Sequence, residues 1–390
     1  MKIFENVVVT PVAQSGANKF SGGVFSADGH FVDECRHLRG VNGNVHTSEN
    51  IDVEKLLISY TAPVGLYGGF AFNHFGHFLA ETLGRLWAAA EPQYSDMPIF
   101  VHPIWGRVVL GDREGYVATV FDLLGLDPSR VRFITDPIRI ARLYVPEQLY
   151  GFHNFEHVSE KMIGFLSKAQ ASIEEKAKEF PKGDERLYVS RSQWLPEKGL
   201  IAGEAEFETF LASQGWTIYC PEKAPFIEQL IAYSNAKQII FSEGSAYHSM
   251  ILLPNSRADV AIVFRRKPGW NQERIEAQFH GFGKKLLSVQ HVRRQICAGM
   301  PNWSGVSIVD FEAVSKDLVA AGFISESFAK WYEREEELCA RDLARFIESV
   351  ASDRRFLNFV EKSRNYPVPQ QKNEPASVGA TAKWLIAEMG

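Results

Sequence analysis

The chain has 390 residues, of which 45% are hydrophobic and 23% charged, and its net charge is −5. This balance is typical of a folded protein, and the length favours two domains over one or three. An acidic chain lacks the overall electrostatic footprint of a nucleic-acid-binding protein, so we expect no nucleic-acid partner. The short basic cluster at 265–267 is typical of a solvated face or a local anion site.

Targeting and cysteine patterns favour a reducing compartment. Residues 1–14 are too polar for a signal peptide, and no run of about 18 apolar residues predicts a transmembrane segment. The four cysteines form no CxxC pair, so no structural zinc site is expected. We expect a cytoplasmic protein, either free or held at a membrane surface by partners.

The first part of the chain mixes strands and helices. Turn residues before residue 50 predict hairpins between short β-prone segments. Hydrophobic periodicity then predicts the following elements: a strand over 56–61, a loop over 65–69, a helix over 73–90, a strand over 97–102, a helix over 115–126, a strand over 141–146 and a helix over 159–178.

After a polar segment at 179–185, which we interpret as a linker, strands and helices alternate regularly as far as residue 264. The expected strands are 187–191, 216–220, 238–242 and 259–264, and the expected helices are 203–214, 224–235 and 245–253. This alternation predicts an α/β fold with a parallel sheet, which binds ligands at the carboxyl ends of its strands. From residue 310 the pattern is mostly helical, with a loop over 364–380 and a short terminal helix over 381–389. The predicted domains are 1–181 and 182–309, followed by a helical extension over 310–390.

Two segments of the second domain suit a phosphate group. In FSEGSAYHSM (241–250) small residues follow a strand and open a helix, so backbone N–H groups of Gly244, Ser245 and Ala246 can face a crevice. Taken alone, an ordinary turn with a capping serine is the more frequent explanation. Arg191 ends another strand of the same predicted sheet and can bind a diphosphate with its fork of N–H groups, although a surface arginine is also common.

A third segment, GGFAFNHFGHFLAETLGRLW (68–87), brings two histidines and a carboxylate to the start of an apolar helix. His77 and Glu81 are four residues apart and share a face. His74, His77 and Glu81 could form a metal site, but their spacing is a weak zinc signal. Each histidine could instead be structural. In a third interpretation His77 is a general base whose tautomer or pKa is tuned by Glu81. A serine hydrolase is disfavoured because no GxSxG motif is present.

These segments in this order resemble glycosyltransferase family 61, which contains bacterial capsular-polysaccharide proteins, plant xylosyltransferases and animal N-acetylglucosaminyltransferases. The similarity covers roughly residues 60–265. It rests on these motifs: FNHFGHFLAE (72–81), GRLW (84–87), Ser190-Arg191, the Glu204-x-Glu206 helix start, Gly215-Trp216, Pro221-Glu222, Glu228-Gln229 and Glu243-Gly244-Ser245-Ala246. Where many family members have His before this last glycine, the chain has Glu243, which would repel a diphosphate unless it points elsewhere, for instance towards a ribose hydroxyl.

The resemblance implies a GT-B fold, in which two Rossmann-like domains face a cleft, and an inverting reaction with no metal or other cofactor. We expect a UDP-linked sugar donor, a carbohydrate acceptor and a role in bacterial surface polysaccharide synthesis. The expected donor-binding residues are Arg191, Glu228, Glu243, Gly244, Ser245 and Ala246. Asn73 and His74 are expected on the acceptor side, His77 as the base and Glu81 as its partner.

The sequence is also compatible with two functions that involve no sugar transfer. The chain could be a carbohydrate-binding or scaffold protein that keeps the fold without turnover, or a hydrolase that uses the His77–Glu81 pair. Whichever of these functions the protein has, the C-terminal helices could join two copies of the chain in a homo-oligomer.

Overall fold

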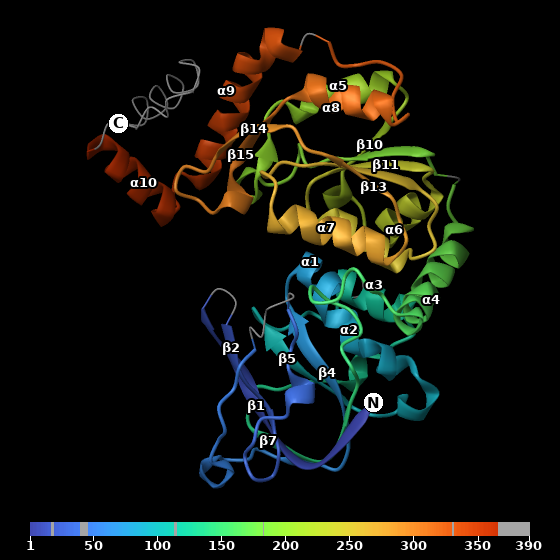
Figure 1. The fold of residues 1–390 in the computed structure, drawn as a ribbon, viewed down its shortest axis with the longest axis vertical. Helices are drawn as coiled ribbons and strands as arrows, with labels where there is room; N and C mark the ends of the chain where they lie inside the picture. Colours follow the sequence, from blue (N-terminus) through green and yellow to red (C-terminus); the bar gives the residue numbers. More distant parts are fainter. Residues whose placement is uncertain (17–18, 40–45, 113–114, 182, 330, 366–390) are drawn as a thin grey trace.

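The computed structural model describes residues 1–16, 19–39, 46–112, 115–181, 183–329 and 331–365. Figure 1 shows two lobes, one containing strands β1 to β7 and the other containing strands β8 to β15, with helices α1 and α3 where the lobes meet. The predicted α/β fold with parallel strands is confirmed. No helix of the described chain is long and apolar enough to cross a membrane.

The N-terminal sheet is mixed, with the strand order β2-β1-β7-β4-β5-β6 and β3 beside β7. Strand β1 pairs antiparallel with β2 and β7, whereas β4 runs parallel to β7 and β5, and β6 runs parallel to β5. The bounds are β1 (Lys2–Gly16), β2 (Lys19–Phe25), β3 (Thr61–Ala62), β4 (Gly65–Phe72), β5 (Ile99–Ile104), β6 (Val131–Phe133) and β7 (Ile138–Val145).

Strand β4 corrects two sequence predictions. The expected loop over 65–69 is the start of this fully buried strand, and the expected strand over 56–61 contributes only its last residue, Thr61, to β3. The glycines of β4 serve close packing, because a Cβ on Gly65 would lie 2.5 Å from the Phe100 ring and one on Gly68 would lie 2.6 Å from a methyl of Val101. Leu57, in contrast, is 88% exposed, so its segment has no core to join.

The helix predicted over 73–90 is present as four consecutive helical segments. These are α1 (Phe75–His77), the π-helical turn η3 (Phe78–Thr82), α2 (Leu83–Leu86) and the 3₁₀ turn η4 (Trp87–Ala90). A π-helical turn inside a helix is frequent at functional sites. The segment is tied to the chain after β7, because the Gly84 carbonyl accepts a hydrogen bond from the amide of Leu149 at 2.9 Å.

The second sheet confirms the regular alternation predicted after residue 185. Its strands, in the order β10-β8-β11-β12-β13, are all parallel. The strands are β8 (Arg186–Val189), β10 (Thr217–Tyr219), β11 (Gln238–Ser242), β12 (Asp259–Val263) and β13 (Leu286–Val289). The helices are α5 (Glu204–Ser213), α6 (Phe226–Asn235), the 3₁₀ helix η9 (Ser245–Leu252) and α7 (Trp270–Gly281). A small sheet of β9 (Leu200–Ile201), β14 (Val292–Ile296) and β15 (Val306–Val309) lies beside it.

The two lobes share one hydrophobic core. A single buried cluster includes Leu66 and Val101 of the first sheet together with Leu187 and Ile239 of the second. Helix α4 (Glu160–Ala177), whose N-terminus is capped by Ser159, packs on α3 (Tyr116–Leu123), α6 and η9 and so joins both lobes. The domain division at residue 181 therefore stays a prediction.

The remaining segments are short or C-terminal. Helix α8 (Phe311–Ala320), capped by Asp310, packs its buried face with α5, and α9 (Trp331–Val350) and α10 (Arg354–Asn365) follow. The loop predicted over 364–380 lies almost wholly outside the described residues, and the helix predicted over 381–389 lies wholly outside them. The isolated 3₁₀ turns are Asp33–Cys35, Val53–Lys55, Pro92–Tyr94, Pro128–Arg130, Pro196–Lys198, Pro221–Lys223 and Asn302–Ser304.

Candidate active site

Glu81 lies at the centre of a buried charged network beneath the start of helix α1. Its Oε1 lies 2.6 Å from Nδ1 of His77, and its Oε2 lies 3.1 Å from both His37 Nε2 and Arg39 Nε. Burial alone would raise the pKa of this carboxyl, but hydrogen bonds from His37 and His77 and the charge of Arg39 outweigh burial and lower the pKa to about 2. Glu81 is therefore an ionised carboxylate at neutral pH.

This carboxylate orients His77. The Nδ1–H group donates to Glu81, because the shortest contact of this nitrogen is to a negatively charged oxygen; Arg39 Nη2 lies farther away, at 3.2 Å. With the proton on Nδ1, the lone pair of Nε2 is available to accept a proton. Among the described residues, no side chain or backbone group is hydrogen-bonded to Nε2, and the side chain of His77 is 25% exposed. The arrangement is that of a base held by a fixed partner.

Parallel strands β4 and β5 bring further side chains to His77. Phe72 and Ile104 are paired at the carboxyl ends of these strands, so the segments that follow, with His74 and Trp105, lie side by side. The ring centroid of His77 lies 5.0 Å from that of His74 and 4.8 Å from that of Trp105. The surrounding protein lowers the pKa of His74 to about 4, first through desolvation and then through the charges of His77 and Lys198. His74 is therefore a neutral side chain at physiological pH.

The two segments of the second sheet that suit a phosphate are in contact. A Cβ on Gly244 would lie 2.4 Å from Nη1 of Arg191, so the guanidinium packs directly on the turn that opens η9. Nη2 of Arg191 donates to the carbonyls of Lys198 and Gly199 at 3.1 and 3.2 Å, which fixes the direction of the side chain. Arg191 and Gly244 are thus neighbours at the carboxyl edge of the parallel sheet, as the sequence predicts.

Glu243 faces arginines of the protein. Its buried carboxylate accepts hydrogen bonds from the backbone amides of Arg265 and Arg266 at 2.9 and 3.0 Å and from Nε of Arg266 at 2.5 Å. Burial acts to raise its pKa, and the charges of the two arginines outweigh this and lower it. The repulsion expected between this carboxylate and a diphosphate is therefore compensated within the protein.

The arginine cluster, formed by Arg191, Arg265 and Arg266, carries more positive charge than its acidic neighbours neutralise. Burial lowers the pKa of Arg265 to about 9 and raises the pKa of Glu204, which accepts from the amide of Arg191, to about 7. Among the described residues, Nη1 of Arg265 and Nε of Arg191 are buried without a hydrogen-bond partner. The negative charges that act on Arg191 come from Glu204, Glu243 and Glu222, and Glu204 is only partly ionised at neutral pH, so the three arginines keep positive charge that suits an anion.

The histidine helix and the arginine-lined turn meet where the lobes join. A Cβ on Gly76 would lie 3.0 Å from Oγ of Ser245 and 3.1 Å from Cδ2 of His248. A Cβ at residue 76 would therefore crowd these two side chains, which would have to shift by a few tenths of an ångström, so glycine allows a close approach of α1 to η9. The segment that carries His77 therefore packs on the segment that follows Gly244, the neighbour of Arg191, and the residues on both sides of this contact are called the composite site below.

Both segments of the candidate site lie within one family match. Residues 75–260, which begin two residues before His77 and extend past Gly244, match glycosyltransferase family 61. The chain belongs to glycosyltransferase family 61. It is a glycosyltransferase and acts on a sugar donor and an acceptor. No curated protein matches the chain.

The remaining predicted residues of this glycosyltransferase lie near the composite site or apart from it. Ser245 and Ala246 open η9 beside Gly244, and Asn73 is exposed next to His74. A Cβ on Gly106 would lie 3.3 Å from Nδ2 of Asn73. Glu228 is exposed in the first turn of α6, and no contact joins it to the arginine cluster within the described chain.

Several residues of this candidate site are not predicted from the sequence. His37 and Arg39 come from an irregular segment with no periodic pattern, and Trp105 follows β5 without a motif. His248 stands within the 241–250 segment; it is buried and paired with Gln278 at 2.6 Å. The basic cluster 265–267 was recognised as a candidate anion site, but its place beside Arg191 depends on the order of strands in the sheet.

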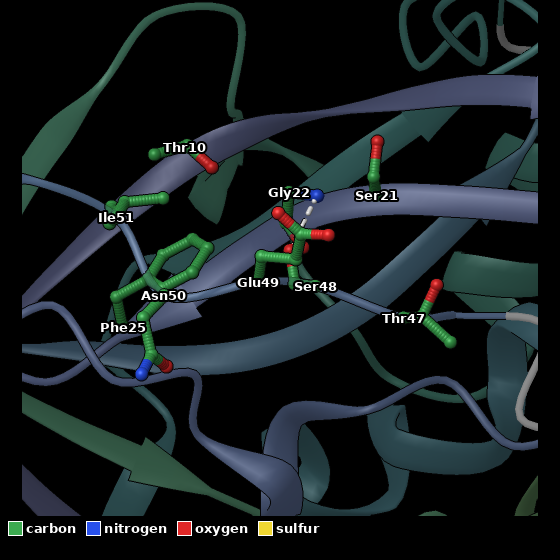
Figure 2. A pocket seen from close by; sticks show the side chains of 9 residues that line it. All are labelled: Thr10, Ser21, Gly22, Phe25, Thr47, Ser48, Glu49, Asn50 and Ile51. Atoms are coloured by element: carbon green, nitrogen blue, oxygen red, sulfur yellow. Dashed lines mark hydrogen bonds between the residues drawn. The ribbon is translucent and has the colours of Figure 1, made fainter.

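Two further features are separate from these residues. Among the described residues, no group of three or more His, Cys, Asp or Glu side chains is arranged to hold a metal ion. A hollow of about 530 Å³ lies beside β1 and β2 (Figure 2), and none of the predicted site residues lines it. Its lining is mostly small and polar: Thr10, Ser21, Gly22, Phe25, Thr47, Ser48, Glu49, Asn50 and Ile51.

Proposed function

We propose that this glycosyltransferase is an inverting, metal-independent enzyme that transfers a sugar from a UDP-linked donor to a carbohydrate acceptor in bacterial surface polysaccharide synthesis. In this proposal the chain has the GT-B arrangement, with domains 1–181 and 182–309 on the two sides of the composite site. The observation that carries the proposal is the contact of Gly76 with Ser245 and His248, since it unites a base and an anion site.

The arginine cluster is proposed to hold the diphosphate of the donor. Its excess positive charge favours an anion, and the N–H groups of Gly244, Ser245 and Ala246 at the start of η9 add donors. As the glycosidic bond to the phosphate breaks, the leaving UDP gains negative charge that these fixed donors stabilise. Stabilisation by arginines and backbone amides is the reason for proposing a reaction without a metal.

His77 is proposed as the general base. Its Nε2 takes the proton of an acceptor hydroxyl while that oxygen forms a bond to the anomeric carbon of the donor. The bond between this carbon and the diphosphate breaks at the same time, and UDP leaves with the bonding electron pair. A single displacement of this kind inverts the anomeric centre, and Glu81 stabilises the imidazolium that forms.

Calorimetry with UDP tests the donor site. We expect UDP to bind the wild-type protein equally in the presence and absence of EDTA. Arg191→Ala should weaken binding by about 1.5–3 kcal/mol, the range for hydrogen bonds to charged groups. Arg257→Ala is the matched control, because this exposed arginine precedes β12 at the opposite edge of the sheet and should leave affinity unchanged. Absence of UDP binding at millimolar concentration would refute the donor-site assignment, and binding lost in EDTA would refute the metal-free reaction.

A further inference from the structure

Trp105 is an unusual residue for its position in the fold. It comes directly after β5, and 41% of its surface is exposed to solvent. Most other large aromatic residues of this lobe are buried. Its backbone is in the left-handed region, with a φ of 59°, which is costly for a bulky side chain. Such strain in a folded protein is concentrated at functional sites, where surrounding contacts maintain it.

Those contacts fix the indole ring beside the proposed base. The Nε1–H group donates to Oε1 of Gln14 at 2.9 Å, and the ring makes edge-to-face contacts with Phe72 at 5.1 Å and His77 at 4.8 Å between centroids. Because the only polar group of the side chain is already bonded, the exposed part of Trp105 offers aromatic carbon to a ligand. A rigid aromatic surface next to His77 is therefore open to solvent.

An aromatic surface of this kind suits a sugar ring. A pyranose presents C–H groups on a ring face and hydroxyls at its edge, so it can cover apolar surface while its hydroxyls stay free for hydrogen bonds. A ring on Trp105 would have edge hydroxyls near His77 and near the exposed side chains of Asn73 and His74. Stacking would thereby bring a hydroxyl to the base in a fixed orientation.

We infer that Trp105 is the stacking platform for a pyranose ring of the carbohydrate acceptor. The inference rests on the proposed function and goes beyond it by naming the residue that selects and orients the acceptor. The donor sugar is the less suitable occupant, because the arginine cluster that would hold its diphosphate belongs to the other lobe. Trp105 instead shares the β4–β5 edge with His77.

The test measures sugar binding directly on the full-length protein. Saturation-transfer NMR is recorded with a panel of methyl pyranosides in the presence of UDP, for the wild type, Trp105→Gly and Trp105→Phe. Glycine removes the ring and also relieves the left-handed strain, so this variant should fold. The matched control is Phe180→Ala, which removes an aromatic side chain of nearly the same exposure, 40%, from the segment after α4. UDP and UDP-glucose affinities are measured by calorimetry on the same samples.

We expect at least one methyl pyranoside to bind the wild type, with saturation strongest on the C–H protons of one ring face. Trp105→Gly should weaken this binding by about tenfold or more, as loss of an aromatic stacking contact does, whereas Trp105→Phe and Phe180→Ala should retain most of it. Unchanged pyranoside affinity in Trp105→Gly, or no pyranoside binding to the wild type, would overturn the inference. A loss confined to UDP-glucose relative to UDP would assign the ring to the donor sugar and also overturn it. Failure of UDP binding alone would refute the donor site and leave the platform supported.

Discussion

Glu81→Gln is the sharpest test of His77 as the proposed base, because it replaces one buried oxygen of Glu81 by an amide nitrogen at nearly constant side-chain volume. Oε1 of Glu81 serves His77, and Oε2 serves His37 and Arg39. A glutamine can present its single oxygen to only one of these two sides. The orientation of the amide therefore decides the protonation of His77.

The amide oxygen should face Arg39. The opposite orientation would place the amide NH₂ against the guanidinium of Arg39, a charged donor whose side chain is only 9% exposed, and two donors that face each other at a buried position are unfavourable. With the oxygen on the Arg39 side, the NH₂ group faces Nδ1 of His77 and donates to it. His77 then carries its proton on Nε2, where the base needs a free lone pair.

The expected loss of turnover is about 10²–10⁴-fold, the range that general-base catalysis contributes. Stability should fall by about 3 kcal/mol, the low end for breaking a buried ion pair, because the partly negative amide oxygen still lies against the Arg39 guanidinium. Binding of UDP should be nearly unchanged, since the arginine cluster lies on the other side of the site. The sequence spacing alone predicts a smaller loss than for His77→Ala, because Glu81 would only orient or tune the imidazole, whereas the two-sided network predicts a loss close to that of His77→Ala.

The assay combines UDP release from the sugar nucleotide that supports wild-type turnover with ¹⁵N NMR of the histidine rings. Thr82→Val is the matched control, because Thr82 is the residue after Glu81 and makes no hydrogen bond to His77. The substitution removes the buried hydroxyl that accepts from the Phe72 amide, so it destabilises the same helix. This control should lose stability and keep its turnover. A Glu81→Gln protein with wild-type turnover, or with the His77 proton still on Nδ1, would refute the reasoning.

Three further predictions follow from packing and burial. Gly244→Ala should weaken UDP binding about tenfold or more in calorimetry, because the new methyl would lie 2.4 Å from a guanidinium nitrogen of Arg191 and displace it; wild-type affinity would contradict this. Burial raises the pKa of Glu204 from 4.5 to about 7. The protonated carboxyl therefore makes its full contribution to the free energy of unfolding below pH 4.5, and this contribution is lost as the pH rises through 7. In urea denaturation Glu204→Gln should therefore gain up to about 3 kcal/mol at about pH 8 and almost nothing at about pH 4.5, and an equal gain at both would count against a protonated buried carboxyl. Gly84→Ala should destabilise by about 2 kcal/mol or more, because its Cβ would lie 2.1 Å from a backbone carbonyl oxygen, whereas Gly164→Ala, with open space in α4, should stabilise by up to about 1 kcal/mol in the same measurement.

The sequence pattern alone predicts most strands and helices of the second lobe. Apolar strand segments of the parallel sheet are separated by helices of regular length, so the alternation from residue 187 to 264 predicts the elements and the edge on which ligands bind. The contact of Arg191 with Gly244 follows from that edge. The spacing of His77 and Glu81 on one helix likewise predicts their hydrogen bond, because it depends only on local helical geometry.

Contacts between segments that are distant in the sequence could be identified only from the tertiary structure. His37 and Arg39 contact Glu81 from a segment about forty residues earlier in the chain. This segment is irregular, so it has no hydrophobic periodicity from which the positions of its side chains could be predicted. The sequence predicts a loop at the start of β4 because its glycines are typical of loops, whereas in the structure Gly65 leaves room for the Phe100 ring. Trp105 stands beside His77 only because β4 and β5 are parallel neighbours in register. The sequence by itself thus determined the helices, strands and side-chain pairs that depend on residues close together in the chain. The fold decided which distant side chains complete the candidate site, because strand order and register depend on the packing of the whole core.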